Sequence, residues 1–79
     1  MDDLTAAEAA IARIRGAKFR TTRWDGYDAD EVDDFLDEMI AQLGRGESVA
    51  PGVPAFTRTR LRPGYRTADV DALLREFGI

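Results

Sequence analysis

The sequence contains neither cysteine nor histidine, and these two absences narrow its chemistry before any motif is considered. Without cysteine there is no disulfide to stabilise the chain and no thiol nucleophile. Without histidine the chain lacks the commonest general base and the commonest metal ligand. No apolar run approaches the ~20 residues that a membrane-spanning helix needs. We therefore expect no enzymatic activity and no cofactor, since a chain this small forms no deep pocket for its paired carboxylates.

What remains is the composition of a small globular protein. The 79 residues are 44% hydrophobic and 33% charged, which is ordinary for a soluble domain. We predict a single domain over residues 1–79 with a small core. The acidic start, Met1-Asp2-Asp3, lacks the positive charge of a signal peptide, so a cytoplasmic location is expected.

An internal repeat organises the sequence. Each copy opens with a phenylalanine and an Arg/Thr-rich run, reaches Gly-Tyr, and continues four residues later with Val-Asp-x-apolar-Leu. The second copy has one additional residue before its glycine. We assign repeat one to residues 17–43, a Gly/Pro-containing linker to 44–54, and repeat two to 55–79. The shared positions are Phe19, Gly26, Tyr27 and Asp33 in the first copy, and Phe56, Gly64, Tyr65 and Asp71 in the second.

Helical periodicity follows the Gly-Tyr pair in both copies. Apolar residues recur at intervals of three and four, which predicts one apolar stripe on each of two amphipathic helices. These stripes comprise Val32, Phe35, Leu36, Met39, Ile40 and Leu43, and then Val70, Leu73, Leu74 and Phe77. Asp28 with Glu31 and Thr67 are the predicted N-caps, while Gly44 and Gly78 mark the ends.

These features together predict an all-α fold. A short helix from Thr5 to Arg15 precedes a loop, the longer helix, the linker, a second loop and the final short helix. We expect Gly26 and Gly64 to adopt a positive φ, which lets each following tyrosine fold back onto the next helix. The tyrosine hydroxyls are expected to reach a backbone or carboxylate partner. For Asp33 and Asp71 two alternatives remain open: a bond to an arginine of the preceding loop, or simple exposure.

The first copy resembles the DivIVA domain family of bacterial cell-division proteins. The resemblance rests on Leu4-Thr5, on Phe19, and on the run Gly26-Tyr27-Asp28-x-Asp30-Glu31-Val32-Asp33-x-Phe35-Leu36. It covers nearly all of residues 4–43, and a shorter version recurs over 54–77. Membership would imply a cytoplasmic scaffold that gathers at the septum, the poles or other curved membrane and recruits partner proteins. It would also imply a parallel dimeric head, in which a short helix and a crossing loop precede a coiled-coil helix.

Two features depart from the family pattern. The family places an aromatic residue and an arginine before Gly-Tyr, where they touch the membrane. Here Trp24 is followed by Asp25, and the nearest equivalent in the second copy, Leu61-Arg62, is displaced by Pro63. No long heptad region follows the second copy, so this sequence resembles the head without the filament-forming tail.

The repeat leaves two pairing arrangements open. The two copies can pair within one chain as a pseudo-dimer, because the linker is long enough to bring the second and third helices side by side. Alternatively, the stripe of the second helix packs against its counterpart in a homodimer.

The predicted function is that of a non-catalytic interaction module, a scaffold or adaptor that docks on cell-division or cell-pole proteins, other DivIVA-type proteins among them. The alternative is a peripheral protein that binds anionic or curved bilayers at the inner face of the membrane. A third option is an accessory head that caps or blocks larger DivIVA-type assemblies. The residues predicted to contact a partner or membrane are Arg20, Arg23, Trp24, Arg58, Arg60, Leu61 and Arg62.

Two other binding functions are disfavoured. The formal net charge of −4 argues against nucleic acid, and no groove-entering helix carries the arginines. The acidic run Asp28-x-Asp30-x-x-Asp33 lacks the glycine and terminal glutamate of a calcium-binding EF-hand loop. A solvated helix face is the simpler interpretation of these acids.

Overall fold

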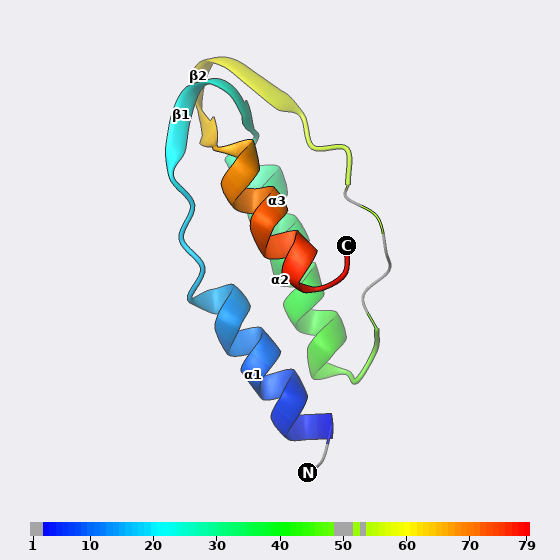
Figure 1. The fold of residues 1–79 in the computed structure, drawn as a ribbon. Helices are drawn as coiled ribbons and strands as arrows, with labels where there is room; N and C mark the ends of the chain where they lie inside the picture. Colours follow the sequence, from blue (N-terminus) through cyan, green and yellow to red (C-terminus); the bar gives the residue numbers. More distant parts are fainter. Residues whose placement is uncertain (1–2, 49–51, 53) are drawn as a thin grey trace.

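The computed structural model describes residues 3–48, 52 and 54–79, and it contains both helices and strands. The element order is α1 (Asp3–Arg15), β1 (Thr21–Tyr27), α2 (Ala29–Gly44), β2 (Arg58–Tyr65) and α3 (Thr67–Glu76). Helices α2 and α3 both begin at the small sheet and run away from it in the same direction, whereas α1 runs toward it (Figure 1). The middle of the predicted linker, at residues 49–51 and 53, lies outside the described residues.

The helices form where the sequence predicts them, with small corrections at their ends. Helix α1 begins at Asp3, two residues before the expected start. The Asp28 carboxylate accepts the backbone N–H of Glu31, which confirms the predicted cap of α2. The N-cap of α3, in contrast, is Arg66 without a side-chain hydrogen bond, so the prediction that Thr67 caps this helix is wrong. Thr67 is instead its first residue.

The all-α prediction is wrong, because the two segments expected to be loops form a two-stranded sheet. Thr21 lies opposite Tyr65, Trp24 opposite Arg60, and Tyr27 opposite Arg58, so the partner number falls along β1 as in antiparallel strands. One further pair, Tyr27 with Tyr65, breaks this order, and the register shifts repeatedly, so the strand pairing is irregular and is assigned as parallel in spite of the falling partner numbers. Glycine, proline and aspartate in these segments have low strand propensity, and only contact between distant segments makes them strands.

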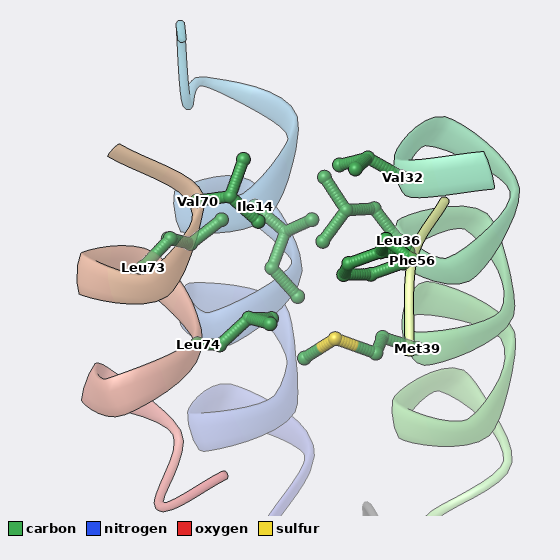
Figure 2. Close-up of a cluster of buried hydrophobic side chains, with 8 residues drawn as sticks. All are labelled: Ile14, Val32, Leu36, Met39, Phe56, Val70, Leu73 and Leu74. Carbon is green, nitrogen blue, oxygen red and sulfur yellow. The ribbon is translucent and has the colours of Figure 1, made fainter. Parts of the chain in front are cut away.

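The core lies between α2 and α3, and it is closed by one residue from α1 and one from the segment before β2. Figure 2 shows these buried side chains pointing toward one another from the different elements. They are Ile14, Val32, Leu36, Met39, Phe56, Val70, Leu73 and Leu74. Phe35, Ile40, Leu43 and Phe77 of the predicted stripes are partly buried and pack against this cluster. The two repeats therefore pair within one chain in this structure.

The glycines before the tyrosines allow two backbone segments to approach each other closely, and they do not adopt an unusual backbone angle. Neither Gly26 nor Gly64 is among the residues with positive φ, so that expectation is wrong. A Cβ atom at Gly26 would lie 2.7 Å from the Tyr65 carbonyl oxygen, and one at Gly64 would lie 2.6 Å from that of Tyr27. The two backbones cross so closely at this point that only glycine fits.

We predict that Gly64→Ala destabilises the protein by about 2–3 kcal/mol, because its methyl group meets a backbone carbonyl that has no room to move. Urea unfolding followed by circular dichroism would measure the change. Gly44→Ala is the matched control, since nothing lies within 4 Å of a Cβ at Gly44, the last residue of α2. That control should be as stable as the natural protein or slightly more so. Equal stability of the two variants would contradict the tight crossing.

Candidate docking site at the sheet end

The tyrosines beside the crossing connect each repeat to the helix of the other. The Tyr27 hydroxyl donates to the Asp71 carboxylate in α3, and the Tyr65 hydroxyl donates to the Asp33 carboxylate in α2, both at 2.9 Å. Burial raises the pKa of both tyrosines, and the carboxylate partners raise it further. The predicted carboxylate partners of the hydroxyls are thus confirmed. Of the two alternatives left open for Asp33 and Asp71, a bond to an arginine is not found among the described residues, and the tyrosines reach the opposite helix rather than their own.

The end of the molecule formed by β1 and β2, here called the sheet end, carries the two large apolar side chains that are exposed among the described residues. Trp24 in β1 is 66% exposed and Leu61 in β2 is 82% exposed. The backbone near both is unusual: Asp25 has a φ of 57° and Leu61 itself a φ of 63°. The left-handed conformation costs a residue with a side chain about 1–2 kcal/mol. Leu61 is therefore held in an unfavourable conformation and gains little from burial.

Three of the arginines predicted to contact a partner are engaged in ion pairs within the chain. Arg58 pairs with Asp25 at 2.8 Å and also lies over the Tyr27 ring. Arg62 pairs with Asp28 at 2.6 Å, and Arg20 with Asp69 at 3.0 Å. Arg62 and Arg20 hold the sheet region to the starts of α2 and α3, and Arg58 joins β2 to β1, which leaves all three less available to an external ligand.

The other two predicted arginines, Arg23 and Arg60, are exposed on the strands next to Trp24 and Leu61. Among residues 3–48, 52 and 54–79, neither takes part in an ion pair. Asp25, which departs from the family pattern beside Trp24, has its carboxylate matched by Arg58. The sheet end thus presents two apolar side chains with two unmatched positive charges.

The acids at the start of α2 are already engaged as well. Asp28 caps the helix and pairs with Arg62, and Asp33 accepts from Tyr65. The bond from the Glu31 backbone N–H, with the nearby Arg62, lowers the pKa of Asp28. Within the part of the chain that the structure describes, no group of three or more acidic side chains is placed to hold a metal ion.

The structure separates the predicted residues into two sets. The stripe residues and Phe56 form or border the core, whereas the predicted contact residues lie on β1 and β2 or, in the case of Arg20, directly before β1. Thr59 is a structural residue that was not among the predicted ones: it is buried with 1% exposure and donates to the Gly26 carbonyl. Its position between two exposed arginines is the alternation of a strand, and this signal was present in Arg58-Thr59-Arg60.

Comparison with protein-family models, curated protein sequences and solved structures finds no match to this chain. The resemblance to the DivIVA domain therefore remains a prediction from the motif. No helix within the described residues is long and apolar enough to cross a membrane.

We predict that the Arg20–Asp69 contact makes stability depend on acid pH. Hydrogen bonds from the Arg20 side chain and backbone lower the pKa of Asp69 from 3.8 to about 2. A lowered folded-state pKa means that the contribution is present above the unfolded-state pKa and is lost as pH falls from about 4 through about 2. Melting temperatures at pH 7, 4 and 2 would show the natural protein converging on Asp69→Asn. A constant difference across this range would contradict the assignment.

Proposed function

We propose that this chain is a non-catalytic docking module of the DivIVA type, which binds protein partners of the cell-division or cell-pole machinery through its sheet end. The observation that carries the proposal is the joint exposure of Trp24 and Leu61 at one end of the molecule. Large aromatic and aliphatic side chains that protrude together are typical anchors of protein interfaces. The protein would act by placing this end against a partner rather than by changing a substrate.

The backbone at Leu61 adds independent support. A glycine would relieve the left-handed strain at this position, and the leucine side chain contributes little packing because it is 82% exposed. Unfavourable backbone conformations that persist in folded proteins cluster at functional positions. A leucine kept here is therefore better explained by contact with another molecule than by the stability of this one.

Membrane docking is the second candidate, and the unmatched charges of Arg23 and Arg60 favour it. An amphipathic aromatic ring and a leucine flanked by arginines suit the interface of an anionic bilayer. The Arg58–Asp25 pair removes the repulsion that the Asp25 carboxylate would otherwise exert on lipid headgroups. This contact would place the protein at the inner face of the membrane at a septum or pole.

We expect Leu61→Gly combined with Trp24→Ala to abolish septal or polar enrichment of the fluorescently tagged protein in dividing rod-shaped bacteria. The matched control is Trp24→Phe with Leu61→Met, which keeps both side chains apolar and should keep the enrichment. The free energy of unfolding of Leu61→Gly alone should lie within about 1 kcal/mol of that of the natural protein. The relief of backbone strain offsets the greater conformational entropy that glycine gives the unfolded chain. Unchanged enrichment in the folded double variant would exclude the sheet end as the docking surface.

Vesicles distinguish the two candidates. The purified protein would be mixed with anionic vesicles at low and high salt, and Trp24 emission and co-sedimentation recorded. If protein docking is correct, the emission stays unshifted and the protein stays in the supernatant. A blue shift with pelleting that weakens at high salt would instead assign the sheet end to the membrane.

A further inference from the structure

The contacts between the two repeats occur twice, at equivalent positions. Tyr27 and Tyr65 are equivalent, as are Asp33 and Asp71, and each tyrosine bonds the aspartate of the other repeat at 2.9 Å. The aromatic contacts follow the same rule. The Phe19 and Tyr65 rings lie 5.1 Å apart at 54°, and the Tyr27 and Phe56 rings have the same separation and angle.

The backbone obeys this symmetry as well. The Arg66 N–H donates to the Arg20 carbonyl at 2.8 Å, and the Asp28 N–H donates to the Thr57 carbonyl at 2.9 Å. Just beside these bonds, the Arg20 N–H donates to Asp69 and the Thr57 N–H donates to Glu31, each at 2.9 Å. In these contacts each repeat presents both the donor and the matching acceptor, which is the property of a self-complementary, two-fold interface.

Only the segment between α2 and β2 makes this pairing intramolecular. Residues 45–55 make up the part of this segment that precedes the buried Phe56, and a chain of that length extends to roughly 38 Å. It has to return only along α2, whose residues 29–44 span about 24 Å. The segment is thus long enough for repeat two to leave its own chain and still reach the same position on a neighbouring one.

We propose that a second copy of this chain binds by exchange of repeats. Residues 3–44 of each chain pair with residues 56–79 of the other, and both heads keep all the contacts described above. The intramolecular form dominates in dilute solution, because the linker holds the two repeats at an effective concentration in the millimolar range. The exchanged form builds up where many copies gather and are folding together. It joins two sheet ends in one particle and so strengthens any docking through them by avidity.

Charge reversal tests the exchange in the full chain. Among the described residues, four ion pairs join the first half to the second, and the test reverses two of them: Arg13 with Glu76 at 2.6 Å and Arg20 with Asp69 at 3.0 Å. One variant carries Arg13→Glu and Arg20→Asp, and the other carries Asp69→Arg and Glu76→Arg. In each variant alone, both of these pairs place two like charges next to each other within one chain. In a dimer with exchanged repeats between the two variants, every pair is again of opposite sign in both heads.

We expect the mixed variants, unfolded and refolded together, to give at least about tenfold more dimer by analytical ultracentrifugation than either variant alone. Native mass spectrometry should identify that dimer as one copy of each. The matched control is Arg45→Glu mixed with Glu47→Arg, since this ion pair lies in the segment after α2 and stays within one chain when repeats are exchanged. A mixture that stays monomeric while both variants are folded would overturn the proposal, as would equal dimer formation by the control mixture.

A second measurement on the unsubstituted chain covers the case in which the variants fail to fold. Two differently labelled populations would be unfolded, mixed and refolded at protein concentrations rising to about 1 mM. Exchange predicts dimers that carry both labels and increase with concentration. Absence of mixed-label dimers over the whole range would overturn the proposal.

Discussion

The close crossing of two backbone segments at Gly26 and Gly64 is the constraint on which the rest of this structure depends. Each glycine lies where a Cβ atom would meet the carbonyl oxygen of the tyrosine that follows the other glycine, at 2.6 to 2.7 Å. Because the segments approach so closely, Tyr27 and Tyr65 extend across the crossing and reach α3 and α2 respectively. The Gly-Tyr pair of the repeat is therefore a device for interlocking two copies, and each copy needs the other to complete it.

This dependence explains how so short a chain forms a core. Val32, Leu36 and Met39 of α2 are covered by residues of α3, so a single repeat would leave its apolar stripe in water. A domain of this size has little stability in reserve. Linking the two repeats in one chain removes most of the entropic cost of bringing two molecules together, which a separate partner would have to overcome. The ion pairs from Arg20, Arg58 and Arg62 to helix and loop carboxylates add modest support, since exposed pairs contribute little.

The features that could be predicted from the sequence are those set by neighbours along the chain. The helices follow from apolar residues three and four apart, and the α2 cap from Asp28 with Glu31. The sheet could not be predicted in this way, because β1 and β2 lie far apart in sequence and neither has the composition of a stable strand. The role of the glycines was misassigned for a related reason, since a close approach between distant segments leaves no local signal. The sequence located the predicted contact residues in the two segments that precede the helices. It did not indicate which of their arginines form ion pairs within the chain.

The distribution of arginines separates structural from external roles at the sheet end. Arg58 and Arg62 have carboxylate partners, which are Asp25 near the end of β1 and Asp28 directly after β1. Their charges are used to hold the sheet end in the shape that projects Trp24 and Leu61. Leu61 is too exposed for burial to offset the unfavourable energy of its left-handed backbone conformation. The contacts of the surrounding residues must therefore stabilise that conformation. A rigid, internally matched base that presents two apolar side chains is preorganised, and preorganisation lowers the entropy lost when a partner binds. These matched charges and the unfavourable Leu61 conformation therefore favour the proposed docking role of the sheet end over a purely structural one.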